Sequence, residues 1–502
     1  MDDRPNILLI MTDQQRYDSL SCYGSEVVQT PNVDRLAEEG VLFEHCYVNN
    51  PVCTPSRVSM FTGKPLPGHG VYRLHDILPQ DQALFTKHLQ ERGYTTALFG
   101  KLHVSGRSFE LDNRHPNDGF DIYEESKAPY RLAGSLNGYA RWLRREHPEF
   151  AAKLEKAGRD VGNFPEEVHL TRWISGSTVR FIEEQDGSRP FFCFMSIFDP
   201  HEPYTDFPLC MRELVDEQSL PEPNLVEGES HAKPEGIQRE HEHSYLGNFH
   251  NYSAEDIRRM RLGYFASIAF IDQEVGKVLA ALERKGILYN TLIIFVSDHG
   301  DMLGDHELLA KGAFFYDPCT RVPCIVRLPR QVEAGRRSGE LVQPSDIAAT
   351  VLTQAGFGAE ELDELMPDSR DLVSLAARRT PGRDHAVCLY RATSICDRKL
   401  YWDPPINATM FRDRRYKLNV YHAPPGVVAG FDGELYDMEN DPLERKNLWS
   451  EPEYAETKSR LLARTMDWIV ETDRTYHSSS GGEAFPPKSQ WVLNNPLPGR
   501  EK

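Results

Sequence analysis

The sequence lacks the features that would anchor a protein in a membrane or staple it with disulfides. Its 502 residues contain no apolar run near the roughly 18–20 residues that cross a bilayer. The first residues, Met-Asp-Asp-Arg-Pro, lack the basic stretch of a secretion signal. The nine cysteines are odd in number, scattered and without a CxxC pair, which is more typical of a reducing compartment than of a disulfide framework. We therefore expect a cytoplasmic protein with no membrane partner.

Positive charge is also scarce. Lys and Arg number 57 against 76 Asp and Glu, which gives a formal net charge of −19. This balance excludes a general nucleic-acid binder, because such proteins gain affinity by neutralising phosphates. An anionic ligand would need a small, local positive site. The hydrophobic fraction of 40% and the charged fraction of 26% are those of an ordinary globular protein.

Three apolar runs indicate buried strands: Asn6–Met11, Phe191–Phe198 and Thr291–Val296. Each is followed by acids, histidines or amides, in the segments Thr12-Asp13-Gln14, Asp199-Pro200-His201 and Ser297-Asp298-His299-Gly300. Because ligands bind at the carboxyl edge of open α/β sheets, this pattern predicts an α/β fold with its site along that edge. Helical periodicity is expected over 32–39, 83–92, 170–184, 254–285 and 345–355.

We divide the chain into a catalytic α/β domain over 1–375, a smaller α+β subdomain over 376–475 and an extended tail over 476–502. The polar stretch 203–253, weakly periodic and rich in Pro, Glu and His, is expected to be a lid or insertion near the site. Short strands are expected over 386–390, 409–412, 416–421 and 434–437, followed by a helix over 454–472. The Pro-rich tail could pack on a second subunit, so a homo-oligomer is a possible assembly.

The strongest motif is Cys53-Thr54-Pro55-Ser56-Arg57, with Thr62-Gly63 downstream. It matches C-x-P-S-R, the pattern by which sulfatases have a catalytic cysteine oxidised to formylglycine. A lone cysteine is more often a buried small hydrophobe, but the multi-position match outweighs that interpretation. A hydrated formylglycine offers one hydroxyl to attack sulfur or phosphorus, while the other later expels the bound group. Arg57 lies one helical turn on and could hold the hydroxylate.

Further motifs appear in family order. They include Asn6-Ile7-Leu8-Leu9-Ile10-Met11-Thr12-Asp13-Gln14, Gly100-Lys101-Leu102-His103, Ser297-Asp298-His299-Gly300 with Lys311, and the block from Glu434-Leu435-Tyr436-Asp437 to Asn447-Leu448. Over roughly residues 5 to 450 the chain resembles the type I, formylglycine-dependent sulfatases of the alkaline phosphatase superfamily. The resemblance implies a large mixed, mostly parallel sheet flanked by helices, with a smaller C-terminal α+β domain.

The resemblance also implies one divalent metal ion, held by Asp13, Gln14, Asp298 and His299 with an oxygen of the modified Cys53. Mostly oxygen ligands favour Ca²⁺, with Mg²⁺ or Mn²⁺ as alternatives. Many family members carry Asp-Asp and Asp-Asn at these positions. The Asp-Gln and Asp-His version is similar to the phosphonate monoester hydrolase and choline-sulfatase branches. The alternative to metal binding is a purely structural role, in which Asp13 and Asp298 cap helices that follow their strands.

The remaining polar residues can be given roles. Lys101 and Lys311 would bind the sulfate oxygens and stabilise charge in the transition state. His103 would take a proton from the diol, and His201 with Lys311 would protonate the leaving oxygen. Taken singly, each would more often be a surface residue or a satisfied core residue. Their positions in the motifs favour function.

The sequence thus predicts a sulfuric ester hydrolase that acts on a small sulfate ester and needs a formylglycine-generating maturation enzyme. One alternative is a phosphonate monoester or phosphodiester hydrolase on the same scaffold, and promiscuity between the ester classes is expected. Lys101-x-His103 favours sulfate, because the phosphonate branch has neutral hydroxyl residues in place of this pair. An alternative from another class is a non-catalytic binding protein with unmodified Cys53. No segment identifies the alcohol or sugar part of the substrate.

Overall fold

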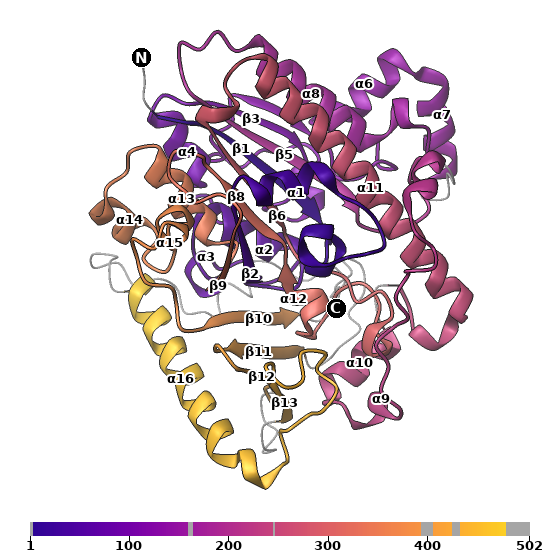
Figure 1. Cartoon of the computed structure of the whole chain (residues 1–502), viewed down its shortest axis with the longest axis vertical. Helices are drawn as coiled ribbons and strands as arrows, with labels where there is room; N and C mark the ends of the chain where they lie inside the picture. Colours follow the sequence, from indigo (N-terminus) through magenta and orange to yellow (C-terminus); the bar gives the residue numbers. More distant parts are fainter. Residues whose placement is uncertain (1–3, 159–163, 244–245, 393–404, 424–431, 478–502) are drawn as a thin grey trace, which may run out of the picture.

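A large mixed sheet forms the centre of the molecule (Figure 1). The computed structural model describes residues 4–158, 164–243, 246–392, 405–423 and 432–477. Within these ranges nine strands form the sheet. Eight run in the order β4 (Ile122–Glu125), β3 (Thr95–Gly100), β5 (Phe191–Pro200), β1 (Asn6–Asp13), β6 (Thr291–Ser297), β8 (Cys324–Arg327), β2 (Val41–Tyr47) and β7 (Arg321–Val322), and β9 (Arg336–Val342) pairs with β2.

The three strands expected from the apolar runs are confirmed as neighbours at the centre of this sheet. β1 lies between β5 and β6 and is parallel to both, with Ile7 opposite Phe192 on one side and Leu292 on the other. β3 and β4 extend the parallel part, whereas β8 runs antiparallel to β6. Parallel strands end at one edge, so the polar residues after β1, β5 and β6 are brought to the same edge.

Both faces of the sheet are covered. Leu8 and Ile10 of β1 join a core beneath α8 (Leu170–Glu184) and α11 (Ala254–Arg284), which lie across the sheet in Figure 1. The alternate residues Ile7, Leu9 and Met11 join a second core with α2 (Cys53–Thr62), α4 (Phe85–Glu91) and α13 (Asp346–Gln354). This division follows from the two-residue period of a strand.

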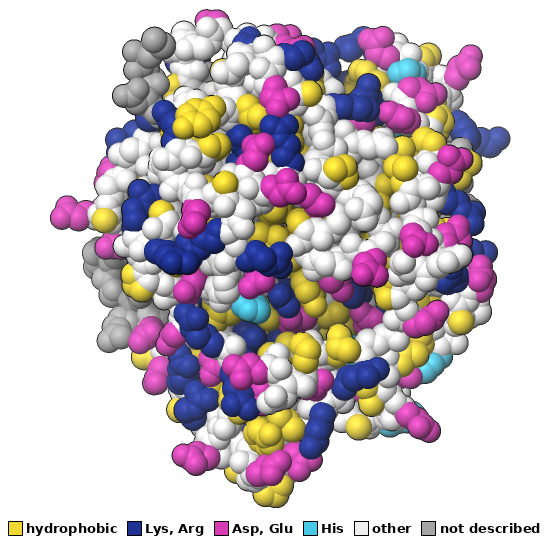
Figure 2. All heavy atoms as spheres, in the orientation of Figure 1, with side chains coloured by type: hydrophobic (Ala, Val, Ile, Leu, Met, Phe, Trp, Pro, Cys, Tyr) yellow, Lys and Arg dark blue, Asp and Glu magenta, His cyan; other side chains and the backbone are white. Residues whose placement is uncertain are grey.

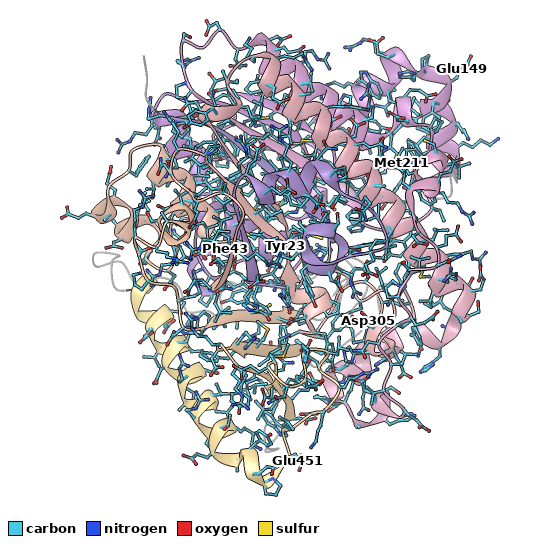
Figure 3. The ribbon with its side chains drawn as sticks, in the orientation of Figure 1. Tyr23, Phe43, Glu149, Met211, Asp305 and Glu451 are labelled. Atoms are coloured by element: carbon cyan, nitrogen blue, oxygen red, sulfur yellow. The ribbon has the colours of Figure 1, made fainter. Side chains whose placement is uncertain are left out.

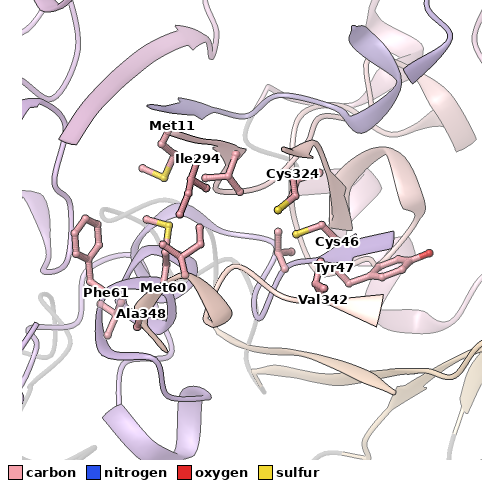
Figure 4. Close-up of a cluster of buried hydrophobic side chains, with 14 of the residues drawn as sticks. Met11, Cys46, Tyr47, Met60, Phe61, Ile294, Cys324, Val342 and Ala348 are labelled. Atoms are coloured by element: carbon pink, nitrogen blue, oxygen red, sulfur yellow. The ribbon is translucent and has the colours of Figure 1, made fainter. Parts of the chain in front are cut away.

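The close-up in Figure 4 shows the second core where α2 meets the sheet. Met60 and Phe61 of α2 lie among Met11, Ile294 and Ala348, all buried. The carbonyl of Phe43, a β2 residue of the same core, accepts from the Tyr23 hydroxyl at 2.9 Å; both residues are labelled in Figure 3. The helix that begins at Cys53 therefore rests on a close-packed, rigid base.

The expected helices are confirmed, with ends that shift by a few residues. They are α1 (Pro31–Glu38), α4, α8, α11, α13 and α16 (Ala455–His477). Besides α2, the other helices are α3 (Leu66–His69), α5 (Arg107–Glu110), α6 (Gly138–Glu146), α7 (Pro148–Ala157), α9 (Glu229–Ala232), α10 (Glu235–His243), α12 (Asp317–Thr320), α14 (Ala359–Leu365) and α15 (Leu372–Ala376). Among the described helices, none is long and apolar enough to cross a membrane.

The segment 203–253, the expected lid or insertion, contains regular structure. Its described residues include the short helices α9 and α10, and residues 244–245 lie outside the description. In α10, Ile237 and Glu240 are buried, whereas Glu235 is exposed. The short length and polar composition of both helices hide their periodicity in the sequence.

A second, antiparallel sheet of four described strands follows: β10 (Ala386–Ala392), β11 (Ile406–Arg412), β12 (Tyr416–Tyr421) and β13 (Asp432–Asp437). One of its faces, including Val387 and Leu389, packs with Leu461 of α16. The other face, including Cys388 and Tyr390, joins the core that α2, α4 and α13 form with the large sheet. The proposed domain limits remain a prediction, and of the proposed tail only its first two residues, at the end of α16, are described.

Candidate active site

Two carboxylates stand at the ends of adjacent strands. Asp13 ends β1, and Asp298 follows β6; both are buried. The Asp298 Oδ1 accepts from the backbone N–H of Gln14 at 3.0 Å and of His299 at 2.9 Å. Gln14 has φ 69°, a left-handed conformation that lets its N–H point back at Asp298. The strand ends and their ligand-type side chains are therefore locked to each other.

Cys53 lies at the centre of the site, as the first residue of α2. Its Sγ is 3.1 Å from His299 Nε2, 3.2 Å from Lys311 Nζ and 3.7 Å from Asp13 Oδ1. The motif from Cys53 to Gly63 spans the whole helix, because Gly63 ends the helix in the left-handed conformation. The Gly63 N–H donates to the Ser59 carbonyl. A helix N-terminus favours negative charge, so this position suits a nucleophile and an anionic substrate.

Arg57 holds the two strand ends together. Its Nε donates to Asp298 at 2.7 Å, its Nη2 to Asp13 at 2.9 Å and its Nη1 to the Lys101 carbonyl at 2.6 Å. The side chain is completely buried. A guanidinium suits this task because its fork presents donors in several directions. The structure thus engages Arg57 with carboxylates, and its expected contact with a hydroxylate stays a prediction.

Lys101 and His103 approach from β3. Lys101 follows Gly100, and its ammonium donates to Asp13 Oδ2. His103 is buried with its Nε2 3.2 Å from the Thr54 hydroxyl, beside the nucleophile. Its other nitrogen, Nδ1, is buried without a hydrogen-bond partner among the described residues. A ring placed in this way can accept a proton.

His201 and Lys311 close the opposite side. His201 Nε2 lies 2.9 Å from Lys311 Nζ, and its Nδ1 lies 3.0 Å from Glu202 Oε2. Lys311 Nζ also donates to Gln14 Oε1 at 2.6 Å. Every site residue predicted from the sequence is therefore brought to one buried cluster, although their catalytic roles stay predictions.

Positive charge dominates the surroundings of Cys53. Burial alone would raise the pKa of the thiol. Lys101, Lys311 and His299 outweigh burial and hold the pKa of Cys53 well below its usual value. The same field would favour a negatively charged nucleophile and the oxygens of a bound sulfate.

The two histidines differ in their electrostatics. Burial, followed by the charge of Lys101, holds the pKa of His103 well below its usual value, so the ring is neutral at pH 7. Burial also disfavours the charged form of His201, but Glu202 and Asp13 raise its pKa to about 9. These pKa shifts would suit a His103 that takes a proton and a His201 that gives one, and both roles stay predictions from the sequence.

The donor set fits a divalent cation. One ligand atom from each of Asp13, Cys53, Asp298 and His299 lies within 4.8 Å of the others, and all four residues are buried. Two carboxylates, one imidazole and the amide oxygen of Gln14 match the preferences of Ca²⁺, Mg²⁺ or Mn²⁺. Two buried carboxylates at such short range also repel each other unless cations separate them.

Sequence reasoning missed several side chains of the site. Glu202 and Asp301 both accept from the Gln14 amide, and Tyr204 donates to Asp301. Thr54 links the nucleophile's helix to His103. Their signal in the sequence was adjacency alone: Glu202 follows His201, Thr54 follows Cys53, and Asp301 lies in the segment that begins at Ser297.

The topology and the cluster at the carboxyl edge define an alkaline phosphatase-like hydrolase. The solved phosphonate monoester hydrolase of Agrobacterium radiobacter is similar over 93% of this chain and 96% of its own, with a TM-score of 0.76 and 26% identity. The arylsulfatase of Clostridium perfringens is 29% identical over 473 residues, which cover 90% of this chain and 92% of the relative. The mouse iduronate 2-sulfatase is 31% identical over 399 residues, which cover 76% of this chain and 70% of the relative.

The sulfatase family model matches residues 5–357, which include every site residue described above. The chain therefore belongs to the sulfatase family, a class of sulfuric ester hydrolases.

Proposed function

We propose that this sulfatase cleaves small sulfate esters, R–O–SO₃⁻, with residue 53 as the nucleophile after oxidation of Cys53 to formylglycine. The observation that supports the proposal best is the arrangement around Sγ, where His299, Lys311 and Asp13 all lie within 3.7 Å. A divalent cation, with Ca²⁺ as the first candidate, would be held by Asp13, Gln14, Asp298 and His299. When bound, it supplies positive charge for the sulfate oxygens.

The chain's own residues would divide the remaining work. Lys101 and Lys311 bind the charged oxygens of the substrate, in a site where burial strengthens each interaction. His201, whose pKa is raised to about 9, carries a proton at pH 7 and gives it to the leaving oxygen together with Lys311, whose Nζ lies 2.9 Å from His201 Nε2. His103, neutral and beside Thr54, accepts the proton that the nucleophile must lose when sulfate is released.

Hydrolysis of phosphonate monoesters is the second candidate. The Asp-Gln and Asp-His ligand pairs and the likeness to the Agrobacterium phosphonate monoester hydrolase favour it. Against it stands Lys101-x-His103, which places a cation and a base where the phosphonate branch has neutral hydroxyl groups. A sulfate preference with some phosphonate turnover fits both observations.

A comparison of kcat/KM for an aryl sulfate and the matching aryl phosphonate ester tests this choice. It requires enzyme produced together with a formylglycine-generating enzyme, which we propose as its maturation partner. We expect the larger kcat/KM for the sulfate. A much larger value for the phosphonate would contradict the proposal.

We also propose that the protein works in the cytoplasm. The scattered cysteines favour the cytoplasm. Those that the structure describes are free thiols, six of them buried (Cys46, Cys53, Cys193, Cys319, Cys324 and Cys388).

A further inference from the structure

Gln14 differs chemically from a carboxylate ligand. A carboxylate can present an oxygen to a cation in either orientation. A carboxamide has one oxygen and one NH₂ group, and only the oxygen can bind a cation. A glutamine ligand therefore needs neighbours that fix the rotation of its amide.

The described contacts of Gln14 fix that rotation. The Nε2 donates to Asp301 Oδ2 at 2.6 Å and to Glu202 Oε2 at 3.1 Å. On the other side, Oε1 accepts from Lys311 Nζ at 2.6 Å. Carboxylates only accept and an ammonium only donates, so these neighbours allow a single assignment of the amide. Turning it by half a circle would set Oε1 against two carboxylates and the NH₂ group against a cation.

Asp301 is itself held for this task. Its side chain is completely buried. The Tyr204 hydroxyl donates to Oδ2 at 2.7 Å, and the backbone N–H of Leu303 donates to Oδ1 at 2.9 Å. Among the described residues, no lysine or arginine side chain forms an ion pair with Asp301. Three donors thus stabilise a buried carboxylate that lacks a countercharge, and a cation at the neighbouring cluster would supply one.

We propose that Asp301, assisted by Glu202, is a positioning residue that presents the Gln14 oxygen to the bound cation. It touches neither substrate nor metal and acts only through the amide. The inference rests on the proposed function, since it takes the Gln14 oxygen as a ligand. Outer-shell partners of metal ligands are typically worth about 10–100-fold in metal affinity.

Ca²⁺ titration by calorimetry, on matured enzyme stripped of metal with a chelator, tests the proposal. Asp301→Asn and Glu202→Gln remove one acceptor each with little change of shape. We expect Asp301→Asn to weaken Ca²⁺ binding about 10-fold or more, and Glu202→Gln to weaken it less, because its contact with Gln14 is longer. Circular dichroism should show an unchanged fold.

The matched control is the same substitution in a Gln14→Ala background. There we expect Asp301→Asn to change Ca²⁺ affinity by less than about twofold, because the amide that it orients is gone. An equal loss in both backgrounds would overturn the inference and leave a purely structural role. Parent-like affinity in both single variants would also overturn it. If the parent itself binds neither Ca²⁺, Mg²⁺ nor Mn²⁺, the metal-dependent function fails as well, so the two failures are distinguishable.

Discussion

At the scale of single residues, the site depends on Arg57 and the two carboxylates that it joins. Arg57 is completely buried, and its partners Asp13 and Asp298 are exposed by at most 1%. Charges in such a place are tolerated only when they are paired and hydrogen-bonded. The same contacts that make the site suitable for a cation therefore make it sensitive to the loss of any one partner.

Arg57→Ala should destabilise the fold by about 3–5 kcal/mol, because it leaves Asp13 and Asp298 buried without their shared cation. Urea unfolding measures the loss of stability. We also expect a lower kcat, because Asp13 and Asp298 lose the contact that holds them together. Arg57→Lys, which restores the charge but not the fork, should recover only part of the stability. Parent-like stability in the alanine variant would show that Arg57 does not stabilise the fold by joining Asp13 and Asp298.

At the scale of elements, the junction of β3 with β5 positions Lys101. Gly100 has φ +106°, and a Cβ added there would lie 1.9 Å from the Ser196 carbonyl oxygen of β5. The chain can therefore bring Lys101 beside Asp13 only if residue 100 has no side chain.

Gly100→Ala should cost more stability than Gly93→Ala, a matched control. Gly93 has φ +85° but open space around its Cβ position, so its substitution costs only the strain of a side chain in the left-handed conformation, about 1–2 kcal/mol. Overpacking should add about 1–3 kcal/mol at Gly100. Thermal unfolding of both variants checks this, and equal losses would show that the close approach carries no cost.

Helix α10 contains a buried acid, Glu240. Its Oε2 accepts from the backbone N–H of Ala313 at 3.2 Å, two residues after Lys311, while Oε1 has no hydrogen-bond partner among the described residues. Burial raises the pKa of Glu240 from 4.5 to about 8. The folded state therefore retains a proton that the unfolded state has lost.

The contribution of this group to stability is complete below pH 4.5 and is lost as the pH rises through about 8. Glu240→Gln, neutral at every pH, should therefore unfold at higher urea than the parent at pH 8.5. At pH 4.5 the two should be alike. A constant difference between parent and variant across this range would show that Glu240 does not titrate with folding.

The elements that sequence reasoning placed well share a strong local signal. β1, β5 and β6 are apolar on both faces, and α11 has a long amphipathic pattern, so their existence follows from burial alone. Cys53 was found through the multi-position motif that follows it, and Asp13 and Asp298 because each stands directly after a buried apolar run in a family motif. Asp301 and Glu202 were missed because an acid that orients an amide and an acid that binds a metal look the same in a sequence. Only their distances to Gln14 separate the two roles.

At the scale of the whole molecule, the second sheet is attached to the rest of the described chain by polar as well as apolar contacts. Lys417 of β12 is completely buried and pairs with Asp317, near the active-site segment, and with Glu444 at 2.8 Å. Figure 2 shows acidic and basic side chains interspersed over the viewed face, where such pairs are exposed to solvent. Buried and exposed pairs should therefore contribute very differently to stability.

Lys417→Met should cost about 3–5 kcal/mol, since it removes the buried cation that Asp317 and Glu444 share. The control is Arg414→Ala. Its pair with Glu340 also joins the second sheet to the large one but is 62% and 30% exposed, and it should cost about 1 kcal/mol or less. Urea unfolding of both variants gives the comparison. Similar values would contradict the proposed role of burial.

The net charge of −19 describes the surface of the molecule rather than its site. Arg57, Lys101 and Lys311 converge on the buried cluster, whereas surface acids are screened beyond a Debye length of about 8–10 Å. A small anionic ester can therefore be bound by a protein that repels polyanions.

The central claim is that residue 53 acts as formylglycine, and the mass of the peptide that contains it tests this most directly. In matured, active enzyme we expect this peptide to be about 18 Da lighter than the cysteine form, since CHO replaces CH₂SH. Cys53→Ala should keep the fold and lose turnover. Full aryl sulfatase activity in protein whose residue 53 is entirely unmodified cysteine would contradict the account.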